Sequence, residues 1–335
     1  MNQNEDHELN GFPQVRLRRL RRTPAIRDLL QETRLSVKDL VCPIFVQEGI
    51  KEPKEIELMP GIFRIPQKSL VKNVQELYDL GVKTFLIFGI PKLKNDRATS
   101  AYRKDGIVQE SVKTIKNNFG EKIVAITDVC LCQYTSHGHC GIIKNNVADN
   151  DESLKILDCV ALSHAEAGTD FVAPSAMMDG QVKSIRKALD HNSFKNVGII
   201  GYSAKLSSNL YTPFRDASHS TPEFGDRKSY QMPFQNTNEA LHEIMMDVKE
   251  GADIIMIKPA LPYLDLIYKT RQSTLLPVCA YSVSGEYSIV KAAALEGWVN
   301  EEEIIMEFTT SIKRAGADII ISYHTKKIAE ILNSN

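Results

Sequence analysis

Eight short apolar segments recur along this chain, and stretches with helical character separate them. The apolar segments cover residues 41–46, 84–89, 123–129, 170–175, 197–203, 254–259, 277–283 and 318–323. Helical patterns include residues 69–80, 152–167, 238–250 and 301–315. Because the segments are apolar throughout rather than alternating, they are typical of parallel strands covered on both faces. Eight such strands alternating with helices predict an α/β fold, the closed (β/α)8 TIM barrel.

A repeated glycine supports this interpretation. Gly81, Gly168, Gly251 and Gly316 each stand between a helical segment and the strand that follows it. A glycine at this position commonly ends a helix in the left-handed conformation. The alternative is an open, doubly wound sheet, but the glycine-rich G-x-G-x-x-G turn after the first strand is missing. The barrel is therefore the predicted fold.

We predict two parts, an extended N-terminal arm over residues 1–38 and a catalytic barrel over residues 39–335. The arm has five arginines between Arg16 and Arg22. Such a block occurs in nucleic-acid-binding arms and in surfaces that dock on another subunit. No aromatic interleaving or zinc-finger spacing accompanies the arginines, so contact with another subunit is the favoured interpretation.

The charge balance also argues against a nucleic-acid or membrane partner. Lysine and arginine number 41, and aspartate and glutamate number 42, so no strong net field attracts either. No apolar run approaches the roughly 20 residues of a membrane span. Residues 1–13 lack the apolar segment of a signal peptide, and six cysteines in 335 residues do not make a disulfide framework. We therefore expect a cytoplasmic protein.

Lys258 ends an apolar run that begins at Ile254, directly before Pro259. A lysine at the end of a buried strand is unusual, because burying an ammonium is unfavourable unless it is paired or deprotonated. In one interpretation the side chain lies along the strand and its head reaches solvent. In the other, the pocket depresses the pKa and the neutral amine attacks a carbonyl to form a Schiff base.

In a barrel the active site lies at the carboxyl ends of the strands, and polar side chains collect at those ends here. They are Asp128, Cys130, Ser175, Ser203, Lys205, Lys258, Ser284 and Tyr323. Lys205 and Lys258 follow adjacent strands, and two nearby ammonium groups lower the pKa of at least one of them. This pairing favours the Schiff-base interpretation of Lys258.

Soft metal ligands are concentrated just past the third strand. Cys130, Cys132 and Cys140 offer three thiolates, a donor set that suits zinc with an open, catalytic position. Free core cysteines are the alternative, but this segment is too polar for a core. His137 and His139 stay open between ligand, ligand-supporting and structural roles. The remaining cysteines lie in apolar runs and are expected to be small buried residues: Cys42, Cys159 and Cys279.

A long segment, residues 202–232, follows the fifth strand and is rich in serine, proline, glycine and aromatic residues. Such a length without a clear helix is typical of an active-site lid. Arg215 and Arg227 within it are either solvated surface side chains or a bidentate clamp for a substrate carboxylate. Their place beside two lysines and the thiol cluster favours the clamp.

Together these stretches resemble the porphobilinogen synthase (5-aminolevulinate dehydratase) family from about Pro43 to the C-terminus. The matching motifs, in chain order, are DVCLCQYTSHGHCG, VAPSAMMDGQV, GYSAK, PFRDA, FGDRKSYQM, GADIIMIKPALPYLD, YSVSGEY and RAGADIIISY. The resemblance implies a (β/α)8 barrel whose arm embraces a neighbouring subunit, commonly in a homo-octamer. It also implies a hydro-lyase of heme (tetrapyrrole) biosynthesis, which condenses two 5-aminolevulinate molecules to porphobilinogen with loss of two waters.

The resemblance assigns roles at the reaction centre. Lys258 matches the lysine that holds one substrate as a Schiff base, and Lys205 matches the lysine that engages the other. Asp128 and Ser175 match polar groups around the first substrate's amine and the reaction centre.

It likewise assigns the two carboxylate sites. Ser284 and Tyr323 match the groups that bind the carboxylate of the first substrate. Arg215, Arg227 and Gln231 match the lid residues that bind the second.

Metals are implied as well. Cys130, Cys132 and Cys140 match the catalytic zinc site of the zinc-dependent branch of the family. Glu243 falls where some members bind an allosteric magnesium at a subunit interface, although it also fits an ordinary solvated helix face. His324 matches no assigned role.

Two competing functions are weighed against this resemblance. An aldolase of phosphorylated sugars would share the strand-six lysine, but it needs a phosphate-binding glycine turn, for which Ser284-Gly285 is a thin candidate. A nucleic-acid-binding or zinc-storage protein would leave Lys205 and Lys258 unexplained.

Overall fold

The computed structural model describes residues 11–334 and divides the chain into two units at residues 34 and 35. The first ten residues of the predicted arm lie outside the described residues. The first unit contains a 3-10 helix η1 (Leu17–Arg21) and a helix α1 (Pro24–Leu29), whose first turn is capped by the Thr23 hydroxyl. None of its described side chains is buried. Its predicted role in subunit contacts stays a prediction.

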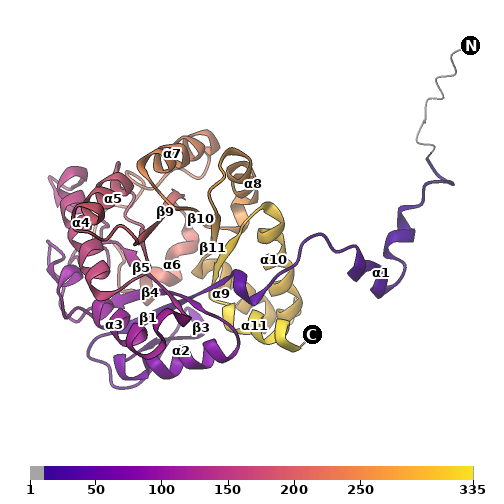
Figure 1. Cartoon of the computed structure of the whole chain (residues 1–335), viewed down its shortest axis with the longest axis horizontal. Helices are drawn as coiled ribbons and strands as arrows, with labels where there is room; N and C mark the ends of the chain where they lie inside the picture. The colour runs from indigo at the N-terminus through magenta and orange to yellow at the C-terminus, as the bar shows by residue number, and fades with distance from the viewer. Residues whose placement is uncertain (1–10, 335) are drawn as a thin grey trace, which may run out of the picture. The chain divides into compact units, whose positions relative to one another are not determined.

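The second unit is a closed ring of eight parallel strands (Figure 1). The strands are β1 (Leu40–Gln47), β4 (Thr84–Ile90), β5 (Val124–Val129), β8 (Phe171–Pro174), β9 (Gly198–Lys205), β10 (Ile254–Lys258), β11 (Val278–Ser282) and β12 (Ile319–Ser322). The ring closes because β12 pairs with β1 through Leu40 with Ile320 and Val41 with Ile321. This confirms the (β/α)8 barrel predicted from the apolar segments.

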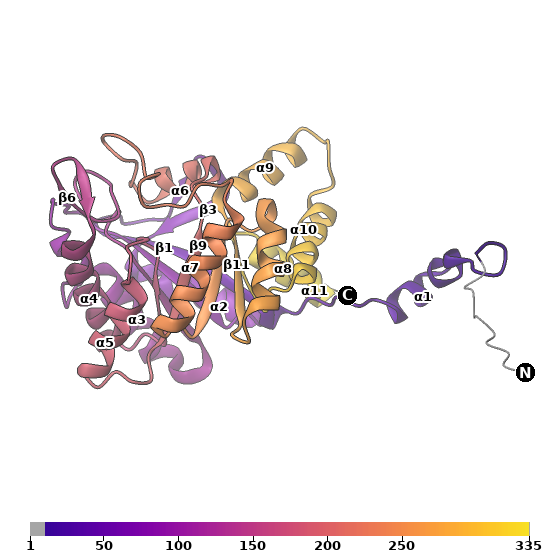
Figure 2. The ribbon, with the colours of Figure 1, turned by 90° about the horizontal axis from the view of Figure 1, so that it is seen from above.

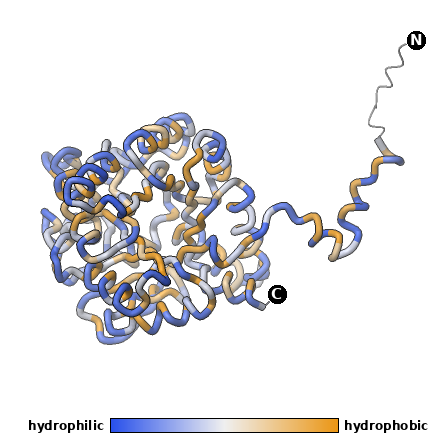
Figure 3. Tube along the Cα trace, in the orientation of Figure 1, coloured by the Kyte–Doolittle hydropathy of each residue, from blue (hydrophilic) through white to orange (hydrophobic). Residues whose placement is uncertain are grey.

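Helices surround the ring and cover its outer face. They are α2 (Leu70–Asp79), α3 (Ile107–Phe119), α4 (Asn150–Ala167), α5 (Gln181–His191), α7 (Thr237–Glu250), α8 (Leu264–Ser273), α10 (Glu301–Ala315) and α11 (Thr325–Ser334). The strands are buried against these helices and inside the ring, and Figure 3 shows hydrophobic residues along the inner parts of the trace. No helix within residues 11–334 is long and apolar enough to cross a membrane.

A glycine followed two residues later by an aspartate recurs three times around the barrel, each time between a helix and the next strand. Gly168 (φ +97°) and Gly251 (φ +100°) end α4 and α7 in the left-handed conformation that glycine adopts without strain. Two residues after Gly168, Gly251 and Gly316 an aspartate follows. A carboxylate oxygen of each aspartate accepts a hydrogen bond from a backbone N–H at the start of the preceding strand: Asp170 from Ala125 (2.7 Å), Asp253 from Ile199 (2.7 Å) and Asp318 from Val278 (2.9 Å). These hydrogen bonds fix the start of each strand and therefore also the position of its carboxyl end.

The carboxyl end of the barrel carries additional elements that the apolar pattern did not predict. A hairpin of β2 (Lys54–Ile56) and β3 (Met59–Ile65) extends from β1, and β6 (Ile142–Lys144) pairs with β7 (Val147–Asp149). A short helix α6 (Thr212–Ala217) and the helix α9 (Ser284–Leu295) lie at the same end (Figure 2). These elements enclose the side chains that the sequence placed at the strand ends.

Candidate active site

Two lysines leave neighbouring strands side by side at the mouth of the barrel. Lys205 is the last residue of β9 and Lys258 the last residue of β10, and the two are register partners in the sheet. Residues paired in this way point to the same face. Both side chains are buried, with 6% and 5% of their surfaces exposed. The burial removes the interpretation in which the head of Lys258 reaches solvent.

Four aromatic rings surround the amine of Lys258. Its Nζ lies 4.2 Å from the ring centre of Tyr281, 5.1 Å from Phe214, 5.2 Å from Tyr202 and 5.4 Å from Tyr211. The pKa of Lys258 is lowered to about 7, first by burial and then by the positive charge of Lys205, while the carboxylate of Asp128 acts in the opposite direction. A large fraction of this lysine is therefore a neutral amine near pH 7.

Lys205 is held differently. Its Nζ donates a hydrogen bond of 2.5 Å to the backbone carbonyl of Ser175 and lies 5.5 Å from the ring centre of Tyr202. The ring of Tyr202 thus lies close to both amines and attracts either one in its charged form. One lysine is anchored by a hydrogen bond, and the other is enclosed by aromatic rings.

Asp128 supplies a buried carboxyl beside the lysines. Gln133 Nε2 donates to its Oδ2 at 3.3 Å, whereas its Oδ1 has no hydrogen-bond partner within the described residues. Burial raises the pKa of Asp128, and Lys205 and the Ser175 hydroxyl act in the opposite direction. An unpaired buried oxygen is unfavourable, so this atom is available to a ligand's amine or hydroxyl.

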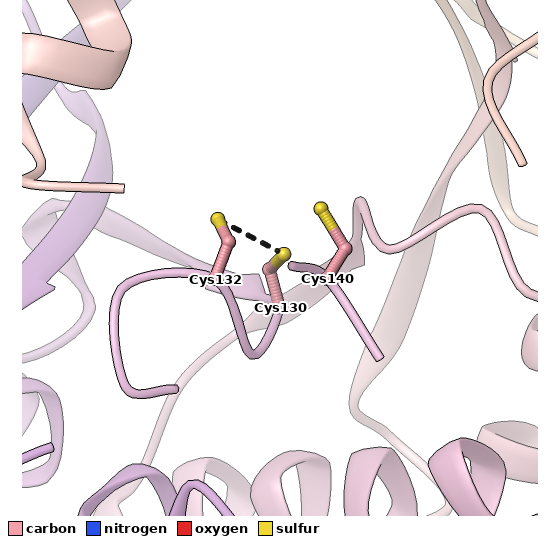
Figure 4. A group of neighbouring side chains, drawn as sticks. All are labelled: Cys130, Cys132 and Cys140. Carbon is pink, nitrogen blue, oxygen red and sulfur yellow. Dashed lines mark hydrogen bonds between the residues drawn. The ribbon is translucent and has the colours of Figure 1, made fainter. Parts of the chain in front are cut away.

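The three cysteines lie close together, as the sequence predicted for residues that share a metal ion. Cys130, Cys132 and Cys140 are all buried, and their sulfur atoms lie within 4.8 Å of one another. Figure 4 shows the three side chains projecting the same way, with the sulfurs of Cys130 and Cys132 3.4 Å apart. Hydrogen bonds from the Cys130 and Cys132 thiols lower the pKa of Cys140, which favours a thiolate there. Within residues 11–334, neither His137 nor His139 belongs to this group.

The lid covers the mouth of the barrel. We use this name for residues 206–235 in place of the predicted 202–232, because residues up to Lys205 belong to β9. The lid includes the 3-10 helix η6 (Asn209–Tyr211) and α6. The expectation of a structureless loop is therefore wrong for its first third. Phe214 of α6 packs on Phe45 and Phe88, with ring centres 5.8 and 5.1 Å apart, and so carries one wall of the lysine pocket.

Three polar residues of the lid keep free hydrogen-bonding groups in this buried region. Within the described residues, Nε of Arg215, Nε of Arg227 and both amide atoms of Gln231 have no hydrogen-bond partner. Burial and the nearby charge of Arg227 lower the pKa of Arg215. Two adjacent guanidinium groups and an unpaired amide are what a bound carboxylate would satisfy.

Comparison with known proteins identifies the family. The model of the "Delta-aminolevulinic acid dehydratase" family matches residues 14–331. The chain belongs to this family. An Archaeoglobus fulgidus delta-aminolevulinic acid dehydratase is 54% identical over 321 residues, which cover 96% of this chain and 99% of that protein. A Bacillus subtilis relative of the same name is 50% identical over 317 residues, or 95% and 98% of the two chains.

A solved structure agrees with the dehydratase assignment. The delta-aminolevulinic acid dehydratase (porphobilinogen synthase) of Toxoplasma gondii, in complex with the reaction product porphobilinogen, superimposes with a TM-score of 0.92 and 38% identity. The match covers 95% of this chain and 91% of that one. These findings confirm the resemblance drawn from the motifs, the enzyme class and the activity: porphobilinogen synthesis by a hydro-lyase of tetrapyrrole biosynthesis.

Two residues that the resemblance gives to a carboxylate site are engaged with other groups. Ser284, the first residue of α9, accepts a hydrogen bond from the Phe214 N–H (3.0 Å) and donates one to the carbonyl of Leu210 (3.1 Å). The Tyr323 hydroxyl lies 2.9 Å from that of Tyr281. A serine has a single donor, so Ser284 must release Leu210 of the lid before it can donate to a substrate carboxylate.

Three histidines to which the resemblance gives no role, His137, His139 and His324, make structural contacts. His139 contacts the lid through both ring nitrogens, and His137 Nδ1 accepts from the His139 N–H at 3.1 Å. His324 is buried, its ring centre lies 4.3 Å from that of Tyr287, and burial lowers its pKa to about 3. It therefore stays neutral near pH 7 and has a packing role.

Glu243 lies on α7. With Asp179 and Glu239 it lines a cavity of about 380 Å³. Burial raises the pKa of Glu243, and the charges of Asp179 and Glu250 act in the same direction. A cation bound in this cavity would relieve that repulsion.

Sequence reasoning made one error among the cysteines and missed the aromatic residues. Cys279 is buried and Cys42 partly buried, but Cys159 is exposed, because it lies on the outer side of the amphipathic helix α4. Tyr202 and Tyr281 lie inside the apolar segments 197–203 and 277–283, and the sequence assigns them no place in the lysine pocket. The available signal was their position, since each lies within three residues of a polar strand end.

Proposed function

We propose that Lys258 is the Schiff-base nucleophile of this dehydratase and that Lys205 engages the second 5-aminolevulinate. The observation that carries this assignment is the register pair of buried lysines: Lys205 is tied to the Ser175 carbonyl, whereas Lys258 is enclosed by aromatic rings and has a pKa lowered to about 7. A neutral amine is nucleophilic and an ammonium is not. The anchored lysine and the enclosed lysine thus have different tasks.

The chemistry follows from the environment of Lys258. Its neutral amine adds to the ketone carbon of the first substrate, and loss of one water gives an imine. The imine withdraws electrons from the adjacent carbon, which makes a proton there more acidic and allows a carbon–carbon bond to form. The four aromatic rings exclude water that would hydrolyse the imine. Asp128 and Ser175 would receive the substrate amine and the protons released, a role that the unpaired Oδ1 of Asp128 supports.

Two carboxylate sites would hold identical substrates in different orientations. Arg215, Arg227 and Gln231 of the lid bind the carboxylate of the second substrate, and this is supported by their unpaired buried groups. Ser284 and Tyr323 bind that of the first substrate once Ser284 releases Leu210. Fixing both substrates removes translational and rotational freedom, which is a large part of the barrier to condensation.

The three thiols fit a zinc ion. In a tetrahedral site with Zn–S bonds of about 2.3 Å, the sulfur atoms lie about 3.8 Å apart, and the observed upper limit of 4.8 Å is within reach of small side-chain rotations. All-sulfur donors favour zinc over magnesium or calcium. Bound there, zinc would polarise a carbonyl or lower the pKa of a water. Cys130, Cys132 and Cys140 would hold it and keep one position open.

Regulation and assembly complete the proposal. Glu243, in its acidic cavity, would bind an allosteric magnesium. The arm, residues 1–38, would contact a second subunit in a homo-oligomer, an octamer by analogy with the family, in the cytoplasm. The arm's exposed leucines and arginines support a role in binding.

Turnover of 5-aminolevulinate to a pyrrole by the purified, zinc-loaded protein tests the assignment of the nucleophile. We expect Lys258→Ala and Lys258→Arg to be equally inactive, because the guanidinium keeps the charge but is no nucleophile. Appreciable turnover by either variant would remove Lys258 from this role. A gel-filtration profile that matches the unaltered protein serves as the control for folding.

A further inference from the structure

The segment that carries the thiols is joined to the lid by a continuous set of contacts. We call residues 130–140 the thiol loop. The Glu223 N–H donates to the carbonyl of His137 (3.1 Å), and Arg227 Nη2 donates to the carbonyl of Gly138 (2.8 Å). The thiol loop therefore offers its backbone to the lid between the second and third cysteines.

Gly138 permits the close approach of these two segments. Its φ of +72° is a conformation that other residues adopt with strain. A Cβ built on it would lie 2.5 Å from the backbone oxygen of Thr221 in the lid. Any side chain at this position would push the lid away from the thiol loop.

His139 makes the most specific contact between the two. Its Nε2 lies 2.9 Å from the backbone carbonyl of Phe224, and its Nδ1 lies 3.0 Å from the Tyr230 hydroxyl. A carbonyl can only accept, so we assign the proton to Nε2; in the neutral ring Nδ1 then accepts from Tyr230. The same hydroxyl accepts from the N–H of Cys140 at 3.4 Å. Both nitrogens are used by the lid and neither is free to bind a metal.

We propose that His139 and Tyr230 form a latch that couples the occupancy of the three thiols to closure of the lid. His139 is a positioning residue that touches neither substrate nor the reacting atoms. The proposal rests on the proposed metal site at Cys130, Cys132 and Cys140. It adds that metal binding changes the lid, a segment that supplies none of the three sulfur ligands.

The coupling has a thermodynamic basis. A metal ion that binds all three thiols fixes the thiol loop and removes much of its conformational freedom. The lid docks on Gly138 and His139 of that loop, so a fixed loop presents these contacts at a smaller entropic loss. Linkage is reciprocal: if the metal favours closure by some factor, closure tightens metal binding by the same factor.

Trypsin cleavage after Lys228 measures lid opening without reference to activity. Lys228 lies in the lid and its side chain is 76% exposed, whereas the neighbouring Arg227 is buried. The full-length protein is digested briefly with zinc and with zinc removed by a chelator, and the Lys228 cleavage rate is followed by mass spectrometry. Zinc itself is the probe, and no substrate is present.

The variants are Tyr230→Phe, which removes one hydroxyl, and His139→Phe, which keeps a ring beside Phe224 but removes both hydrogen bonds. His191→Phe is the matched control, since His191 is exposed at the end of α5. We expect zinc to slow cleavage severalfold in the unaltered protein and in the control. Tyr230→Phe removes the hydrogen bond to His139 and the longer one from the Cys140 N–H, so this protection should fall by at least the roughly twofold to tenfold that one hydrogen bond contributes.

The latch would be overturned if zinc slowed cleavage after Lys228 equally in His139→Phe and in the unaltered protein. It would also be overturned if zinc did not slow cleavage in the unaltered protein. Zinc affinity, measured by competition with a chromophoric chelator, must fall in Tyr230→Phe by the same factor as the protection. If His139→Phe does not fold, Tyr230→Phe alone decides. Failure of the proposed metal site is distinguishable, because no zinc would then bind the unaltered protein at all.

Discussion

The sharpest consequence of the lysine pocket is the pH at which its imine forms. Lys258 has a pKa of about 7 in place of its ordinary 10.5. At pH 7 about half of it is neutral, whereas an ordinary lysine would be neutral in roughly one molecule in 3,000. Burial and the charge of Lys205 therefore raise the fraction of neutral amine at this pH by about three orders of magnitude. The sign is fixed: a depressed pKa makes the amine reactive above pH 7 and protonates it below.

Borohydride trapping measures this directly. 5-Aminolevulinate is mixed with the enzyme from about two pH units below to about two above the expected midpoint. The imine is reduced, and peptide mass mapping locates the secondary amine. We expect an adduct on the peptide with Lys258, with an initial rate that rises through a midpoint near pH 7. No adduct forms at this position in Lys258→Arg. The experiment also shows whether Lys205 forms a second adduct.

A second perturbation tests the physical cause of the shift. Phe214→Ala removes one of the four rings, which lies 5.1 Å from the amine, and admits water to the pocket. Hydration favours the ammonium, so the midpoint should move upward, and each unit of that movement lowers the neutral fraction at pH 7 about tenfold. A midpoint above pH 9 in the unaltered enzyme, or a downward shift in Phe214→Ala, would refute the reasoning.

Three further outcomes are expected. Lys258→Met should be inactive yet more stable at pH 7 by up to about 4 kcal/mol, because the unfolded chain binds a proton that the pocket disfavours. The gain, measured as the free energy of urea unfolding, should shrink as the pH rises from 7 towards 10.5. A loss of stability at pH 7 would contradict this expectation. A chelator should abolish turnover and zinc should restore it, whereas Cys140→Ala should stay inactive when zinc is added. Full activity in protein shown by atomic absorption to be metal-free would reject a catalytic thiol site. Asp253→Ala should lower the melting temperature through loss of the bond to Ile199, which is worth about 1–3 kcal/mol, without a change in KM.

The barrel strands were predictable because burial on both faces leaves a continuous apolar run. The run at 254–259 corresponds to β10 (Ile254–Lys258), and the run at 41–46 to β1 (Leu40–Gln47). The hairpin β2–β3 was not predicted, since it is largely exposed and has no such run. The helix α6 was missed because it is short and tertiary contacts, such as Ser284 with Phe214, hold it in place.

The residues of the site also fall into those that the sequence predicts and those that it does not. Ionisable groups at strand ends were predictable, because the carboxyl ends of parallel strands must meet at one rim. The aromatic walls were not, since Tyr202 and Tyr281 have the same sequence signature as buried core. The partners of Ser284 and His139 depend on where the lid lies, and local sequence does not encode the position of a segment 70 or more residues away.

The lid contacts both the pocket of Lys258 and the thiol loop. Phe214 is carried by the lid and is also a wall of the Lys258 pocket, so any opening of the lid hydrates that amine. Hydration restores the ammonium form and removes the nucleophile. Closure therefore produces the reactive amine and excludes the water that would hydrolyse its imine in the same movement. With a metal on the three thiols, the proposed latch between the thiol loop and the lid would place the reactivity of Lys258 under the control of that metal site, because the lid contacts both.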